Sequence, residues 1–212
     1  MHVVITGAGR GIGKVLADRY RAQGCDVTGT ARDGSAEVAL DVTDPKQHKA
    51  MAEKLAMRPV DLLVCNAGVY LDKSQTIDGY PAEMWAQSFA ANVTGVFLTV
   101  QALLPNLRAA QGKIAILSSQ MASHTRAPGG SYIYRSSKAA VLNLGRNLAV
   151  DLRGDGISVG IYHPGWVQTD MGGTGADITV DKAVQGLINR FDTLSLESTG
   201  CFETYEGQSH PY

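Results

Sequence analysis

Short apolar segments alternate with longer amphipathic segments along this chain. Residues 3–5 (VVI) are apolar and β-branched, and residues 11–22 then place apolar side chains at helical spacing. The same alternation, followed to the end of the chain, predicts strands at residues 3–5, 26–30, 37–40, 60–65, 113–117, 157–162 and 200–204, and helices at residues 11–22, 45–56, 81–110, 132–152 and 181–191. Pro105 is expected to bend or end the long helical stretch.

Strands that are apolar at nearly every position are typical of a parallel sheet covered by helices on both faces. The pattern therefore predicts an α/β fold, a Rossmann-type doubly wound parallel sheet of about seven strands. No interior linker or repeat interrupts it, so we expect a single domain over residues 1–212. Ligands of such sheets bind at the carboxyl ends of the strands, and the residues that follow each strand are the functional candidates.

Composition and charge exclude several classes of function. The formal net charge is -1, which lacks the basic footprint of a nucleic-acid binder and gives no attraction to anionic membranes. The cysteines are scattered at Cys25, Cys65 and Cys201, and neither they nor the histidines show metal-ligand spacing. No signal peptide or membrane-spanning apolar run is visible. We expect a cytoplasmic protein that binds no metal, nucleic acid or membrane.

A glycine-rich loop connects the first predicted strand to the first predicted helix. Glycines at such a turn let backbone N–H groups approach a pyrophosphate, and the N-terminus of the helix adds a favourable partial charge. The strand, turn and helix context makes this loop a dinucleotide-binding candidate rather than an NTPase phosphate loop, because no Gly-Lys-Ser/Thr follows. The candidate cofactor contacts here are Gly7, Gly9, Arg10, Gly11, Ile12 and Gly13.

The end of the second strand bears on the choice of cofactor. An acid at this position binds the ribose 2′-hydroxyl of NAD(H), whereas arginine suits the 2′-phosphate of NADP(H). Ala31 stands where the acid is expected, Arg32 follows it, and Arg10 lies nearby in the glycine loop. Two guanidinium groups favour NADP(H) over NAD(H). A shift of two residues would instead make Asp33 the acid and favour NAD(H).

A tyrosine and a lysine lie one helical turn apart in the helix predicted after the fifth strand. Tyr134 and Lys138 are four residues apart and so share one helix face. An ammonium beside a phenol lowers the pKa of the phenol toward a value useful for proton transfer. Ser119 follows the fifth strand, where a hydroxyl can bind a substrate oxygen or cap a turn.

These motifs together resemble the short-chain dehydrogenase/reductase family over nearly the whole chain. The stretch 118–143 and the C-terminal tail are most similar to the branch that contains C-factor and the sniffer-type carbonyl reductases. The motifs that carry the resemblance are the glycine loop from Thr6 to Gly13, Asp41-Val42, Asn66-Ala67-Gly68, Asn92, Tyr134 with Lys138, and the segment containing Pro164, Gly165, Val167 and Thr169.

The resemblance implies a catalytic set of Asn92, Ser119, Tyr134 and Lys138. It implies that Tyr134 is the general acid or base, that Ser119 orients the carbonyl, and that Asn92 holds a water in a proton relay. Lys138 is implied to hold the nicotinamide ribose and to lower the pKa of Tyr134. Ser119 lies further before Tyr134 than in most family members, so Ser118 and Ser123 remain alternatives.

Further cofactor contacts follow from the same resemblance. They are Asp41, Val42, Asn66, Ala67, Gly68, Pro164, Gly165, Val167 and Thr169, besides Tyr134 and Lys138. The sequence thus predicts an NADP(H)-dependent oxidoreductase that acts on a small-molecule carbonyl or alcohol. A catalytically silent dinucleotide-binding protein with a signalling role is the alternative, because fold does not fix function. The resemblance to this family also implies a homodimer or homotetramer, with a monomer as the alternative.

Overall fold

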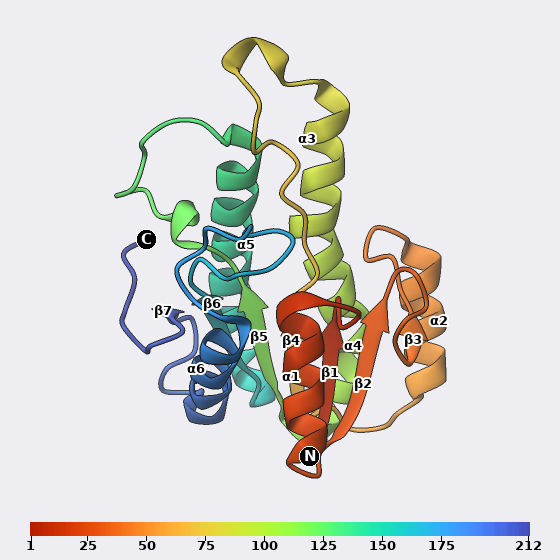
Figure 1. The fold of residues 1–212 in the computed structure, drawn as a ribbon. Helices are drawn as coiled ribbons and strands as arrows, with labels where there is room; N and C mark the ends of the chain where they lie inside the picture. The colour runs from red at the N-terminus through yellow and green to blue at the C-terminus, as the bar shows by residue number, and fades with distance from the viewer.

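A seven-stranded parallel sheet forms the centre of the molecule (Figure 1). The computed structural model describes all residues, 1–212. The strand order is β3-β2-β1-β4-β5-β6-β7, so the order reverses between β1 and β4. The strands are β1 (His2–Thr6), β2 (Asp26–Ala31), β3 (Val38–Ala39), β4 (Leu62–Cys65), β5 (Lys113–Leu117), β6 (Ser158–His163) and β7 (Phe202–Thr204). The α/β doubly wound prediction is confirmed.

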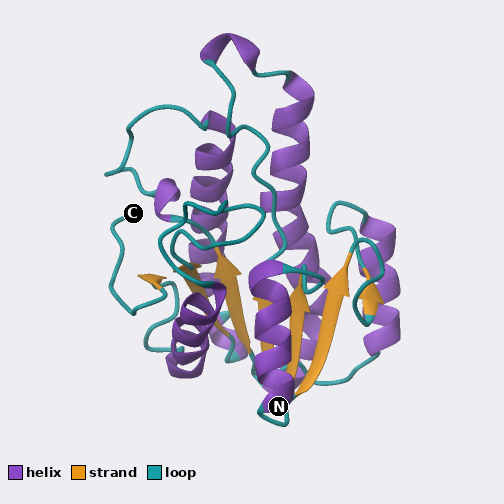
Figure 2. Ribbon diagram, in the orientation of Figure 1, coloured by secondary structure: helices purple, strands orange, loops and turns teal.

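Helices cover both faces of the sheet (Figure 2). Helices α1 and α6 pack side by side on one face, and α2, α4 and α5 cover the other. The helices are α1 (Gly11–Ala22), α2 (Pro45–Leu55), α3 (Ala82–Phe89), α4 (Gly95–Ala110), α5 (Tyr132–Asp151) and α6 (Val180–Thr193). The strand arrows all point to one edge of the sheet, and the functional candidates follow them there (Figure 1).

Each strand contributes side chains to two hydrophobic cores. Alternation along β1 sends Val4 to the core beneath α2, α4 and α5, and Val3 and Ile5 to the core beneath α1 and α6. All three side chains are fully buried. Burial on both faces explains why the strands read as continuous apolar runs in the sequence.

The long helical stretch is divided in the structure. Pro105 lies inside α4 and does not end the helix, which continues to Ala110. The proline is on an exposed side of the helix, where water can bond the carbonyl it leaves free. The irregularity lies earlier, at a π-helical turn over Ala90–Thr94 that joins α3 to α4. Nothing in the sequence pattern marked this turn.

Other boundaries shift by one or two residues, as expected where helix ends and sheet edges fray. The sixth strand begins at Ser158 and not at residue 157, and the last helix extends to Thr193. No helix lies between β2 and β3.

The segment Ala82–Ala110 is long and apolar enough to cross a membrane by length and composition alone. Within this fold, 44% of its most apolar window is buried in the protein. Val100, Leu103 and Leu107 belong to the core shared with α2 and α5. Core packing therefore accounts for the hydrophobicity of this segment.

Candidate active site

The glycine loop adopts a conformation that side chains would obstruct. Gly7 has φ +69°, a left-handed conformation that favours glycine, and a Cβ there would lie 3.0 Å from both the Ala67 Cα and the Asn66 Nδ2. A Cβ on Gly13 would collide with the Gly7 carbonyl oxygen. Helix α1 begins directly after this loop, with no acidic residue in its first turn and no side-chain cap. Its N-terminal N–H groups therefore remain available for an anion.

The predicted motif after β4 lies directly against this loop. The Thr6 hydroxyl accepts hydrogen bonds from the backbone N–H groups of Asn66 and Ala67, at 3.0 and 3.1 Å. The Asn66 Nδ2 donates to the carbonyls of Thr6 and Gly7, at 2.9 and 3.1 Å. These bonds tie the ends of β1 and β4 together at the point where the strand order reverses.

Gly68 connects this motif to the candidate catalytic residues. A Cβ at Gly68 would lie 3.0 Å from the Asn92 Oδ1 and 3.6 Å from the Lys138 Nζ. The structure thus brings the residues after β4 beside Asn92 and Lys138, as the sequence predicted.

The segment after β6 closes the other side of the glycine loop. Gly165 has φ +90°, and Val167 is buried and forms an isolated parallel bridge with Ile178. A Cβ at Gly11 would lie 3.6 Å from the Thr169 Cγ2, which places Thr169 over the start of α1. The segment that begins at Pro164 and the glycine loop therefore face each other.

Among the residues predicted to select the cofactor, Arg10 and Asp33 bond other residues of the protein, whereas Arg32 is exposed. The Arg10 guanidinium donates to the Asp170 carboxylate at 2.8 Å, although both side chains are largely exposed. Arg32 is exposed directly after β2. The Asp33 carboxylate accepts bonds from the backbone N–H and hydroxyl of Ser35, at 3.1 and 2.6 Å, and these bonds lower its pKa. Asp33 is thus turned back onto its own loop.

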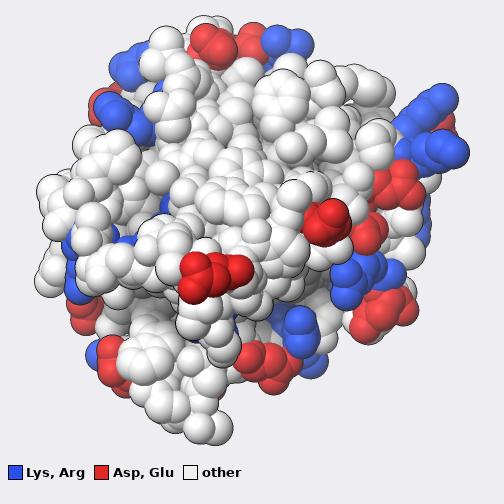
Figure 3. Space-filling model, turned by 90° about the horizontal axis from the view of Figure 1, so that it is seen from above, with Lys and Arg blue, Asp and Glu red and all other residues white.

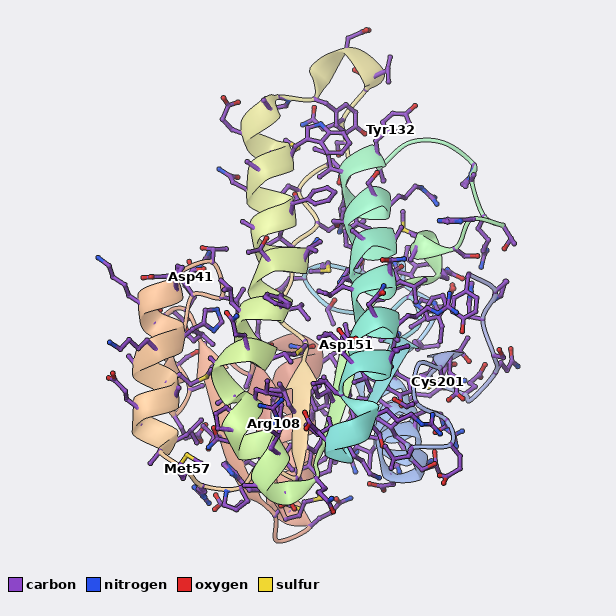
Figure 4. The ribbon with its side chains drawn as sticks, turned by 180° about the vertical axis from the view of Figure 1, so that it is seen from behind. Asp41, Met57, Arg108, Tyr132, Asp151 and Cys201 are labelled. Atoms are coloured by element: carbon purple, nitrogen blue, oxygen red, sulfur yellow. The ribbon has the colours of Figure 1, made fainter.

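Asp41 and Val42 follow β3 at the edge of this face (Figure 4). The Asp41 carboxylate accepts bonds from the backbone N–H and hydroxyl of Thr43, which lower its pKa. Val42 lies against Gly95 of α4, where a Cβ would be 2.9 Å from the Val42 Cβ. The close packing leaves the Asp41-Val42 backbone fixed beside the sheet.

Tyr134 and Lys138 lie on the inner face of α5. Both are buried, and the Lys138 Nζ lies 5.7 Å from the centre of the Tyr134 ring. The Lys138 ammonium donates to the carbonyl of Leu117 at the end of β5, at 2.9 Å. Burial lowers the pKa of Lys138 to about 8. The predicted pair is therefore brought together at the sheet edge.

The pKa of Tyr134 corrects the expectation drawn from the helix spacing. Burial raises it above its ordinary value, and the charges of Tyr70 and Asp72 raise it further, whereas a hydrogen bond with the Ser119 side chain lowers it. Lys138 does not produce the expected lowering, because its ammonium is directed to the Leu117 carbonyl. In the structure Tyr134 is held as a neutral phenol.

The three serines that the sequence left open have different surroundings. The Ser119 hydroxyl accepts the backbone N–H of Met121 at 3.1 Å and contacts Tyr134. The Ser118 hydroxyl is buried and donates to the Lys138 carbonyl on the backbone of α5. The Ser123 hydroxyl contacts Thr125 in its own loop. Ser119 is the serine whose hydroxyl meets Tyr134.

Asn92 lies within the π-helical turn that joins α3 to α4. Its side chain is 1% exposed and bonds both backbone groups of Val69, at 2.8 and 2.9 Å. It also donates to the Ser137 hydroxyl on α5 at 2.9 Å. π-helical turns of this kind occur often at functional sites, because the extra residue redirects side chains.

Two residues of the site were missed by sequence reasoning. Tyr70 stacks on Tyr134, with ring centres 4.1 Å apart and an interplanar angle of 20°. The Asp72 carboxylate bonds the backbone at the start of α5. Both follow the Asn66-Ala67-Gly68 motif within a few residues, but no pattern in the sequence paired them with a helix about sixty residues away.

On the face above the carboxyl ends of the strands, most acidic and basic side chains lie toward the rim (Figure 3). Uncharged atoms cover much of the middle, and some acidic side chains lie among them. Tyr80 and Tyr132 form an edge contact with ring centres 5.4 Å apart, besides the stack of Tyr70 on Tyr134.

Comparisons with known proteins agree with this geometry. The model of the short chain dehydrogenase family matches residues 1–177. The C-signal protein of Myxococcus xanthus is 38% identical over 166 residues, which cover 77% of this chain and 99% of that protein.

Solved structures extend the comparison over the whole chain. NADPH-bound carbonyl reductase from chicken fatty liver is 31% identical, with a TM-score of 0.90, covering 100% of this chain and 98% of that one. The carbonyl reductase Sniffer of Drosophila melanogaster, at 24% identity, shares the fold with a TM-score of 0.93, covering 100% of this chain and 99% of that one. The match to the family model shows that the chain belongs to the short-chain dehydrogenase family; it is similar in sequence to the C-signal protein and in fold to the carbonyl reductase Sniffer.

Proposed function

We propose that this protein is an NADP(H)-dependent oxidoreductase that interconverts a small-molecule carbonyl and its alcohol, with Tyr134 as acid and base. The observation that carries the proposal is the meeting of Ser119, Tyr134 and Lys138 at the end of β5. A protein that only bound a dinucleotide would not need a hydroxyl, a buried phenol and a buried amine together.

The residues around the glycine loop fit a dinucleotide. Gly7 has a left-handed conformation, and the absence of a Cβ at Gly13 lets α1 pack tightly against the loop. The uncapped start of α1 would then face a pyrophosphate bound at the loop. Asp41 and Val42 would contact the adenine, and Lys138 would hold the nicotinamide ribose. When bound, the nicotinamide supplies or accepts the hydride.

The chain's own residues would handle the proton. Tyr134 is held neutral by burial, so its hydroxyl can donate a proton to a carbonyl oxygen. The Ser119 hydroxyl, next to the Tyr134 hydroxyl, would donate a second hydrogen bond that orients the same oxygen. Asn92 anchors the segment that follows β4 and the inner face of α5, which fixes the distance between them.

The direct test of the proposal is oxidation of NADPH, followed by absorbance at 340 nm, with a panel of aromatic and aliphatic aldehydes and ketones. We expect turnover with at least one member of the panel and its loss in Tyr134→Phe. Binding of NADPH without turnover across the panel would favour the alternative of a silent dinucleotide-binding protein.

Selectivity for NADP(H) is proposed to depend on Arg32 and Arg10. Support comes from the absence of an acid at Ala31, from the exposed Arg32 after β2, and from the NADPH-bound chicken relative. To bind the phosphate, the Arg10 guanidinium would have to break its ion pair with Asp170. The free-energy cost is small, because exposed ion pairs contribute little to stability.

Replacing Arg32 with Ala is expected to weaken NADPH binding about 10- to 100-fold, the value of a charged hydrogen bond to phosphate. Titration of nicotinamide fluorescence measures this change. NADH, which lacks the phosphate, is the internal control, and its affinity should stay unchanged. An equal loss of affinity for NADPH and NADH would show that Arg32 does not contact the 2′-phosphate.

The pH dependence of NADPH binding should report Lys138. Burial lowers the pKa of Lys138 to about 8, so its ammonium is charged below that pH and loses its proton above it. A neutral amine cannot donate to the ribose as an ammonium does, and the dissociation constant should rise about three- to tenfold between pH 7 and pH 9. Lys138→Met should bind more weakly and show no such rise. A rise of the same size in Lys138→Met would assign it to another group.

A further inference from the structure

The N-terminus of α5 lacks a local cap. Ser131, which precedes the helix, has φ +47° and makes no side-chain hydrogen bond to the first turn. That turn contains no acidic residue. By contrast, α2 is capped by Asp44, whose carboxylate accepts the Lys46 N–H at 2.8 Å.

Asp72, on the loop that follows β4, takes the place of this cap. Its carboxylate accepts the backbone N–H of Ile133 at 2.9 Å and that of Tyr134 at 3.3 Å. Asp72 is 1% exposed, and no basic side chain forms an ion pair with it. The two N–H groups and the N-terminus of α5 compensate the charge of this buried carboxylate.

The same loop is also held by contacts other than those of Asp72. Asn92 holds both backbone groups of Val69, and the Tyr70 hydroxyl lies 2.5 Å from the Ser131 hydroxyl. The loop therefore presents Asp72 from a rigid support. The end of α5 at which it acts is the one that lies above the sheet, where Tyr132 is labelled in Figure 4.

We propose that Asp72 is a positioning residue that holds the first turn of α5, and with it the Tyr134 side chain, in register with Ser119. The inference rests on the proposed function for its kinetic consequence but not for its structural one. Asp72 bonds the backbone nitrogen of Tyr134 itself, so loss of the carboxylate releases the residue that carries the proton. Asp72 touches no reacting atom and acts only through Tyr134.

Two substitutions at Asp72 separate its hydrogen bonds from its charge. Asp72→Ala removes both, and kcat should fall about 10- to 100-fold with little change in KM, as expected for a displaced catalytic group. Asp72→Asn keeps an oxygen acceptor and should retain kcat within about threefold, because Asn and Asp cap helices equally well. Asp44→Ala is the matched control: it removes the cap of α2, lowers the melting temperature, and should leave kcat at saturating cofactor unchanged.

Amide hydrogen exchange provides a measurement that does not depend on turnover. Exchange at Ile133 and Tyr134 should accelerate at least about tenfold in Asp72→Ala, and it should stay slow in Asp72→Asn and in Asp44→Ala.

The outcomes separate the two proposals. Unchanged exchange at Ile133 and Tyr134 in Asp72→Ala overturns the positioning role, as does faster exchange with kcat unchanged. If the unsubstituted protein shows no turnover, the proposed function fails, but faster exchange in Asp72→Ala together with slow exchange in Asp72→Asn still establishes that Asp72 holds the first turn of α5. If Asp72→Ala does not fold, Asp72→Asn decides: faster exchange at Ile133 and Tyr134 with kcat unchanged contradicts the proposal.

Discussion

Replacing Tyr134 with Phe is expected to lower kcat about 100- to 10,000-fold, the range that positioned acid–base groups contribute. The substitution removes only the hydroxyl, so the ring can keep its stack on Tyr70 at 4.1 Å between centres. The affinity for NADPH should therefore stay unchanged, which separates loss of chemistry from loss of binding. Steady-state oxidation of NADPH and a fluorescence titration measure the two quantities.

Tyr132 provides a matched control for this variant. It lies on the same turn of α5, but it is 39% exposed and its ring contacts Tyr80 rather than Tyr134. Tyr132→Phe should keep kcat within about twofold, as is usual for surface substitutions. If Tyr134→Phe retained the unsubstituted rate, Tyr134 would not be the proton donor and the proposed mechanism would be wrong.

Replacing Gly13 with Ala is expected to weaken binding of both NADPH and NADH about 100-fold. The new methyl group would collide with the Gly7 carbonyl and lie 2.5 Å from the Asn66 Nδ2. The glycine loop would have to move away from α1, and small displacements of a binding group have effects of this size. Titration with each cofactor measures the change.

Gly154→Ala is the control for this substitution. Gly154 lies in the short turn Arg153–Asp155, and a Cβ there would meet nothing within 4 Å. Both affinities should stay at their original values in this variant. Retained cofactor binding in Gly13→Ala would instead mean that the pyrophosphate does not lie at the glycine loop.

The sequence could predict the parts of the fold that depend on local pattern. Apolar strands and the spacing of apolar residues in α1 and α5 located both helices nearly to the residue. The edge at which the site forms followed from parallel topology, because the residues after β1, β4 and β5 must meet there. The segment after β4 that ends at Gly68 lies at this edge, beside the glycine loop.

The parts that depend on tertiary contacts could not be predicted. The spacing of Tyr134 and Lys138 suggested that the ammonium lowers the pKa of the phenol. In the fold both side chains are buried, the Lys138 ammonium donates to the Leu117 carbonyl, and burial raises the pKa of Tyr134. The role of Asp72 depends on a contact across 61 positions of the chain. Pro105 does not end its helix, because it lies at an exposed position where the missing N–H is tolerated.

Titration of the purified protein with NADPH and NADH, followed by nicotinamide fluorescence, is the direct test of the proposed cofactor site. We expect saturable binding of NADPH and binding of NADH that is at least about tenfold weaker, because NADH lacks the phosphate contacts. Tighter binding of NADH would show that Asp33, and not Arg32 and Arg10, governs the choice of cofactor. Absence of binding for both would contradict the proposed function.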